Sequence, residues 1–225
     1  MFRSNRSFMR LTLTAAVMLL AACSAADQAV APAVKQSARP AGAPSLDVIT
    51  NAVATDSLSA DFTVTPSGGM FVLGSNAVYF PANAICNPET SSYGPGTWND
   101  ACEPLDHAIN FHAEVRRDES GNRWVDFTPA VRFVPASNAS QTVWMMMKTG
   151  VDVTSENYAQ FGMEWMPTSS PDVTVHEASS DSDLRSYVDI QRDIVFRRVK
   201  HFSGYIVITA RASTEGLLED TIPLW

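Results

Sequence analysis

The sequence has few basic residues, few cysteines and no long hydrophobic run. Its 16 Lys and Arg residues are outnumbered by 24 Asp and Glu residues, which gives a formal net charge of −8. Nucleic-acid binding needs clustered cations that neutralise phosphates, so this balance predicts no nucleic-acid partner. Anionic lipid headgroups would also repel such a chain. The negative charge is typical of a surface that keeps a protein soluble.

The motifs of common enzymes are also absent. The sequence has no H-E-x-x-H, P-loop or G-x-S-x-G pattern. Among the four histidines, His107 and His112 are five residues apart on one expected strand, so they face opposite sides and cannot readily share a metal. His201 fits a hydrogen-bonding role, and Ser203 lacks the strand-turn-helix setting of a nucleophile. We therefore expect no catalytic residue, no metal site and no cofactor.

One acidic stretch, residues 177–183, holds several oxygen ligands of the kind that calcium prefers. It lacks the glycine and the closing glutamate of an EF-hand loop. We therefore interpret it as a solvated acidic loop, with calcium binding as the alternative.

The longest apolar run, Leu11–Ala22, follows a basic start made by Arg3, Arg6 and Arg10. It is too short to span a bilayer and has the length of a signal-peptide core. The sequence therefore predicts a signal peptide over residues 1–22. Its removal takes away these three arginines and no acid, leaving 13 basic against 24 acidic residues and a net charge of −11.

The segment Leu20-Ala21-Ala22-Cys23 resembles the lipobox of bacterial lipoproteins. The resemblance implies that Cys23 is lipidated, that cleavage occurs just before it, and that several acyl chains hold the protein stably on a membrane. Ser24 follows, rather than the aspartate of an inner-membrane retention signal, which favours the outer membrane of the cell envelope. The alternative is ordinary cleavage, with Cys23 left as a passive thiol.

Cys86 and Cys102 remain as a pair in an exported, oxidising setting. They enclose a segment rich in glycine and proline, which has little regular structure and would be stabilised by a covalent link between its ends. In the chain-entropy model, closing a loop of this size contributes about 3 kcal/mol. A metal or redox pair is the alternative, but there is no C-x-x-C and no adjacent histidine. We therefore predict a disulfide.

Three regions follow from composition. Residues 25–45 are rich in Ala, Pro, Gln and Ser without an aromatic residue, which predicts a disordered tether. Residues 46–60 could form a short helix or an arm that packs on the domain, so we assign 23–60 to a tether and arm. Residues 61–225 form one domain, long enough for a hydrophobic core.

The domain shows strand patterns almost throughout. Residues alternate between apolar and polar over 107–115, and a turn at 119–122 makes 116–127 a hairpin. Trp144–Met147 is apolar on both faces, which indicates a central buried strand. Asp181–Gln191 is the one candidate helix. Nine to twelve short strands predict an all-β, antiparallel sandwich of immunoglobulin-like type.

Two patches resemble ZU5-type domains. Gly68–Leu73 with Ala77–Ile85 resembles their opening strands, and Val199–Val207, which contains HFSGY, resembles the closing strand of bacterial ZU5-like exported proteins. Asn83 stands where the family has glycine, and Cys86–Cys102 is an insertion. The resemblance implies a β-sandwich with a role in protein association, and it assigns no catalytic residue.

Tyr93 and Trp98 lie on the Gly/Pro-rich segment between the two cysteines. Aromatic residues on such loops can stack on a sugar or anchor a partner, although Trp98 could equally fold back over the disulfide. We therefore predict a membrane-anchored lipoprotein that presents a non-catalytic interaction or structural module to an envelope partner. The alternative is a carbohydrate-binding module that uses Tyr93 and Trp98 to bind a glycan.

Overall fold

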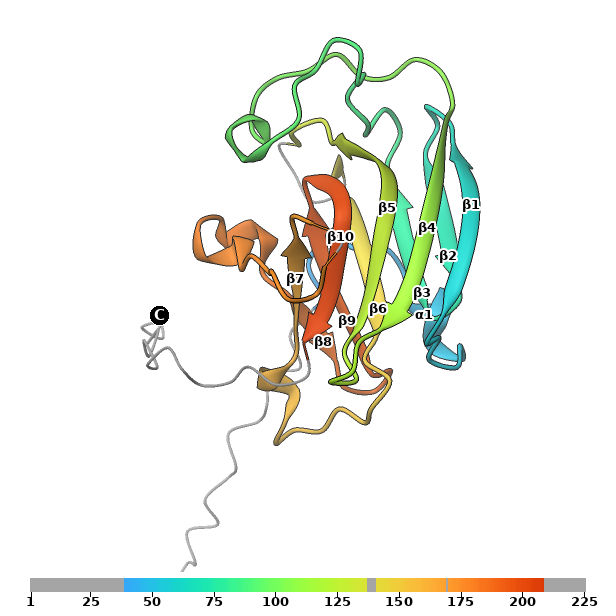
Figure 1. The fold of residues 1–225 in the computed structure, drawn as a ribbon, viewed down its shortest axis with the longest axis vertical. Helices are drawn as coiled ribbons and strands as arrows, with labels where there is room; N and C mark the ends of the chain where they lie inside the picture. The colour runs from blue at the N-terminus through green and yellow to red at the C-terminus, as the bar shows by residue number, and fades with distance from the viewer. Residues whose placement is uncertain (1–38, 137–140, 169, 209–225) are drawn as a thin grey trace, which may run out of the picture. The chain divides into compact units, whose positions relative to one another are not determined.

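Two five-stranded antiparallel sheets pack face to face (Figure 1). The computed structural model describes residues 39–136, 141–168 and 170–208. The first sheet has the order β1-β4-β5-β10-β7 and the second β2-β3-β6-β9-β8. The elements are α1 (Asp47–Thr50), β1 (Leu58–Val64), β2 (Gly69–Leu73), β3 (Asn76–Phe80), η1 (Pro95–Thr97), β4 (Ile109–Arg117), β5 (Arg123–Arg132), β6 (Val143–Lys148), η3 (Tyr158–Gln160), β7 (Gly162–Met166), η4 (Glu177–Ser179), η5 (Ser182–Leu184), β8 (Tyr187–Asp189), β9 (Ile194–Val199) and β10 (His201–Ile208).

This architecture confirms the predicted all-β antiparallel sandwich. The predicted hairpin is also present: β4 and β5 pair up to Arg117 and Arg123, and the turn uses Gly121 at a positive φ of 89°. β1 begins at Leu58, slightly before the predicted domain boundary. The predictions for residues 1–22, for Cys23 and for most of the tether lie outside the described residues.

The core lies between the sheets because the inward-facing residues alternate along each strand. On β4 these are Phe111, Ala113 and Val115, all buried. β6 is central in its sheet, between β3 and β9, and is buried on both faces, as predicted, because one face packs in the interior and the segment before β1 covers the other. Its residues Val143–Met147 contribute alternately to the interior and to the opposite face.

The outer face of the second sheet is also apolar, and the segment before β1 covers it. Ala43, Leu46 and Ile49 are buried against a set of side chains on β3, β6 and β9, namely Ala77, Trp144, Met146, Ile194 and Phe196. The helical turn α1 presents Ile49 to this face, and Asp47 pairs with Arg192 at 3.1 Å. Residues 43–52 are therefore an arm that packs on the domain and contains one short helix. Both alternatives that the sequence left open for this region are present together.

The predicted helix at Asp181–Gln191 is wrong. Asp181 caps only the single turn η5 by accepting a hydrogen bond from the Asp183 N–H. The chain then enters β8, where Tyr187 pairs with Phe196 of β9. The ladder with a buried strand outweighs the weak local preference for a helix.

The closing strand β10 is irregular at one point, and this irregularity positions the site described below. Its pairing with β5 shifts between Phe202 and Gly204, so that Phe202 and Tyr205 both face the core. A Cβ on Gly204 would lie 2.5 Å from the Cε atom of Met166, so a side chain at this position would require the end of the Met166 side chain to move. The shift leaves His201 buried at the start of the strand. No helix among the described residues is long and apolar enough to cross a membrane.

Candidate functional site

Residues 86–102 form a closed segment, here named the disulfide loop. Cys86 and Cys102 are bonded with their Cα atoms 5.6 Å apart, which confirms the predicted disulfide. The loop belongs to the green region above the two sheets in Figure 1, where its short helical turn η1 stands out.

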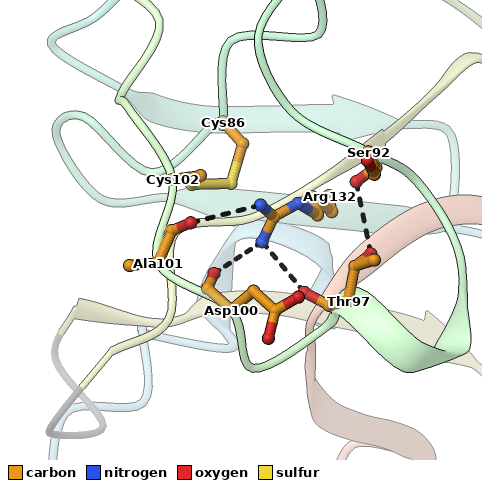
Figure 2. Close-up of a disulfide and its surroundings, with 7 residues drawn as sticks. All are labelled: Cys86, Ser92, Thr97, Asp100, Ala101, Cys102 and Arg132. Carbon is orange, nitrogen blue, oxygen red and sulfur yellow. Dashed lines mark hydrogen bonds between the residues drawn. A yellow bond between two sulfur atoms is a disulfide. The ribbon is translucent and has the colours of Figure 1, made fainter.

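Arg132, at the end of β5, binds the loop from inside (Figure 2). Its Nη1 atom donates to the carbonyls of Thr97 at 2.9 Å and Asp100 at 2.7 Å, and Nη2 donates to Ala101 at 3.5 Å. The N–H of Cys86 donates to the Arg132 carbonyl at 3.0 Å. One residue therefore holds the chain next to both cysteines, independently of the covalent bond.

The two aromatic residues of the loop have different positions. Trp98 turns inward and is 8% exposed, and its indole stacks on the imidazole of His201 with ring centroids 4.1 Å apart. Tyr93 is 42% exposed, and its hydroxyl donates to the Phe202 carbonyl at 2.7 Å. Burial of this hydroxyl raises the pKa of Tyr93. The loop is thus packed against β10, with Tyr93 as its accessible aromatic side chain.

Beneath Trp98 lies a buried polar group, here named the charged cluster: Glu177, Arg197, His201 and Tyr205. Glu177 Oε2 accepts from Arg197 Nη2 at 2.8 Å, and Oε1 pairs with His201 Nε2 at 2.8 Å. Arg197 Nη1 also donates to the Met163 carbonyl at 2.7 Å. The Tyr205 hydroxyl donates to the His201 carbonyl at 2.9 Å.

The charged cluster has no net charge when Glu177 and Arg197 are ionised and His201 is neutral. Burial raises the pKa of the Glu177 carboxyl, but the hydrogen bond from His201 and the charge of Arg197 outweigh it, so the pKa lies below its usual value. Burial lowers the pKa of His201. At neutral pH the carboxylate and guanidinium are charged and His201 is neutral, with its proton on Nε2 because an ionised carboxylate only accepts.

The acidic stretch 177–183 is therefore not simply solvated, and that interpretation is wrong for Glu177, which is buried. Asp181 pairs with Lys200, and Asp183 lies 3.5 Å from Arg198. Each carboxylate of the stretch thus faces a cation of the β9–β10 region. Among the described residues, no group of three His, Cys, Asp or Glu side chains could hold a metal ion.

His176 directly precedes Glu177 and lies 3.5 Å from Glu164 of β7, whereas the other two histidines lie apart from the cluster. His112 lies on β4, where its Nδ1 atom is 2.7 Å from Asp61 and its Nε2 atom is 3.4 Å from Ser59. His107 precedes β4 and pairs with Asp106 at 2.9 Å. These two do not converge with His201. Ser203 accepts a hydrogen bond from Trp165 Nε1 at 2.7 Å, so its hydroxyl serves packing.

Sequence reasoning gave no site role to Arg132, Arg197 or Tyr205, and it interpreted Glu177 as part of a solvated loop. One signal was available. Arg197 stands two residues from Val195 and from Val199, both inward-facing, so strand alternation alone places it in the core. Its partner Glu177 comes from a separate turn 20 residues away, which no pattern in the sequence indicates.

Comparisons with protein families, with curated proteins and with solved structures found no match to this chain.

Proposed function

We propose that this protein is an exported lipoprotein, anchored to a membrane of the cell envelope through Cys23, whose β-sandwich is a non-catalytic interaction or structural module. The segment Leu20–Cys23 supports the anchor by its resemblance to a lipobox. The disulfide between Cys86 and Cys102 supports export, because such bonds persist in oxidising compartments.

The observation that carries the non-catalytic role is the burial of the charged cluster. His201, Arg197 and Glu177 combine a base, a cation and a carboxylate, as many active sites do, but all three are buried and bind one another. Their hydrogen-bonding atoms are occupied inside the domain. The cluster therefore serves to hold the disulfide loop and the acidic stretch in place.

The disulfide loop is the surface we propose for partner contact. Ser92, Tyr93, Pro95, Gly96 and Asn99 are exposed on it. The disulfide and Arg132 fix the backbone that carries them, so binding would cost little further ordering entropy. A rigid loop with one accessible aromatic residue fits a protein partner that supplies an apolar pocket.

The anchor is tested by fractionating cells that express the wild-type chain, Cys23→Ser or the control Ser24→Ala. We expect the wild type and Ser24→Ala in the membrane fraction, with an intact mass that begins at an acylated Cys23, and Cys23→Ser outside it. Recovery of the wild type without acyl groups would contradict the anchor.

The contact surface is tested by photo-crosslinking in the host cell. A photoreactive phenylalanine replaces Tyr93 in one variant and Val151, an equally exposed residue at 46%, in the control. We expect a discrete adduct with an envelope protein from position 93 only. Equal labelling at both positions, or none at either, would argue against the loop as the contact surface.

Glycan binding is the second candidate, favoured by the exposure of Tyr93 on this loop. Since the face of Trp98 is stacked on His201, a sugar would stack on Tyr93 alone. A glycan array probed with the wild type and with Tyr93→Ala separates the cases. Binding that Tyr93→Ala abolishes supports this candidate, and an array without signal removes it.

A further inference from the structure

The segment 176–185, here named the acidic latch, is attached to the sandwich almost entirely by side chains. Its described backbone hydrogen bonds close locally, as in Asp181 N–H to Glu177 and Leu184 N–H to Asp181, both 3.0 Å. Backbone pairing with β7 ends at Val175, which bonds Trp165. The next hydrogen bond to the backbone of β7 is made by Ser186, whose hydroxyl accepts from the Met163 N–H at 2.8 Å. Val175 and Ser186 therefore mark the two ends of the latch.

Three of the attachments are carboxylates on cations. Glu177 pairs with Arg197 and His201, Asp181 with Lys200, and Asp183 with Arg198. Leu184 is the one large apolar side chain of the latch that is buried.

The basic partners, three cations and the neutral His201, form a short strip, Arg197–His201, at the junction of β9 and β10, with Arg197 and Arg198 on opposite faces of β9. The strip also contacts the disulfide loop, because Lys200 Nζ donates to Asn99 Oδ1 at 2.5 Å and His201 stacks on Trp98. In a strongly acidic chain, this concentration of basic residues is covered by the chain's own carboxylates.

We propose that the acidic latch is released by acid, which uncovers the basic strip Arg197–His201 beside the disulfide loop. Adding one proton to either Glu177 or His201 leaves the buried cluster with an uncompensated positive charge, whichever of the two takes it. Protonation of Asp181 removes a further attachment, its pair with Lys200. Release lets the buried cations reach water, while both sheets keep their own ladders.

The groups of β9, β10 and the disulfide loop around the pair act in a consistent direction. β7 adds one attachment of the opposite sense, because Glu164 lies 3.5 Å from the imidazole of His176 and a protonated imidazole would hold that carboxylate more tightly. From β9, Arg197 favours the ionised carboxyl and the neutral imidazole. From β10, Tyr205 is kept un-ionised because burial raises its pKa well above the usual value. From the disulfide loop, Tyr93 remains neutral for the same reason. Because the pKa values of Glu177, Asp181 and His201 are all lowered, the latch holds at neutral pH and opens only in acid.

This inference goes beyond the proposed function, and its test does not need a partner. Hydrogen–deuterium exchange of the full chain is followed by mass spectrometry from pH 7 to about pH 2.5, with rates expressed as protection factors to correct for the intrinsic pH dependence. We expect peptides over 176–186 to lose protection at a pH where peptides over β6 and β10 retain it. Simultaneous loss in all three regions would show global unfolding and overturn the proposal.

The variant Glu177→Gln keeps the shape of the side chain and removes its charge. At pH 7 we expect it to lower the protection of 176–186 by about a hundredfold or more, as when a buried ion pair loses one partner. The control is Glu156→Gln, which changes an exposed carboxylate and should match the wild type. Wild-type protection in Glu177→Gln would contradict the latch, and the wild-type pH series decides the matter if that variant does not fold.

Discussion

The imidazole of His201 and the indole of Trp98 lie nearly parallel, at 23° and with ring centroids 4.1 Å apart. These residues come from β10 and from the disulfide loop, so their stacking joins the loop to the sandwich. Trp165 adds an edge contact to each ring. The loop is therefore part of the folded domain rather than an appendage.

Trp98→Ala should lower the free energy of unfolding by about 3–5 kcal/mol, since it removes a large buried aromatic side chain. Urea denaturation followed by far-UV circular dichroism measures this loss. Tyr93→Phe is the control: it removes only one hydrogen bond from the same loop and should cost about 1 kcal/mol. Equal effects of the two variants would mean that Trp98 packs less closely than described.

Arg132→Lys should loosen the disulfide loop although it retains the positive charge. A lysine ammonium cannot reproduce the planar arrangement in which the guanidinium reaches three carbonyls. We expect faster proteolysis within 86–102 with the disulfide intact. Arg116→Lys, on an exposed position of β4, is the matched control and should leave the proteolysis rate unchanged.

Stability should fall as pH decreases below 6.5 because His201 is held neutral. Burial places its folded-state pKa below the ordinary value of 6.5, so in this range the unfolded chain binds more protons than the folded one. Urea titrations between pH 5 and 8 measure the slope, and His201→Gln should reduce it. His112→Gln should change the slope in the opposite sense, because the hydrogen bond to Asp61 raises the pKa of His112. An unchanged slope in His201→Gln would contradict the assignment.

Ile49→Ala should detach the arm 43–52 from the second sheet. Ile49 is fully buried against Trp144 and Phe196, whereas its neighbour Val48 is 43% exposed. We expect Ile49→Ala to lower the free energy of unfolding by about 2–5 kcal/mol. It should also increase the binding of a hydrophobic dye to the uncovered face of the second sheet. Val48→Ala should do neither. A similar result for both variants would show that the arm does not depend on Ile49.

Local patterns predicted much of the fold. The alternation over Ile109–Val115 gave the face of β4, and the glycine turn gave the hairpin, because both depend on nearby residues. The candidate helix at 181–191 failed because pairing with β9, a tertiary contact, decided the conformation.

The candidate site was less accessible to prediction. The disulfide followed from counting the cysteines together with the expectation of export. The inward position of Trp98 depends on His201, about a hundred residues later, and the state of His201 depends on Glu177. Such contacts are set by packing between segments, which periodicity does not report.

The position of Arg132 also bears on which cysteines pair. Its carbonyl holds the N–H of Cys86, and its guanidinium holds the carbonyl of Ala101, directly before Cys102. The fold can thus bring these two thiols together before any oxidant acts. The chain has a third cysteine, Cys23, which could form a wrong pair. Because Arg132 holds the backbone beside both Cys86 and Cys102, the folded domain favours this pair over any pair with Cys23.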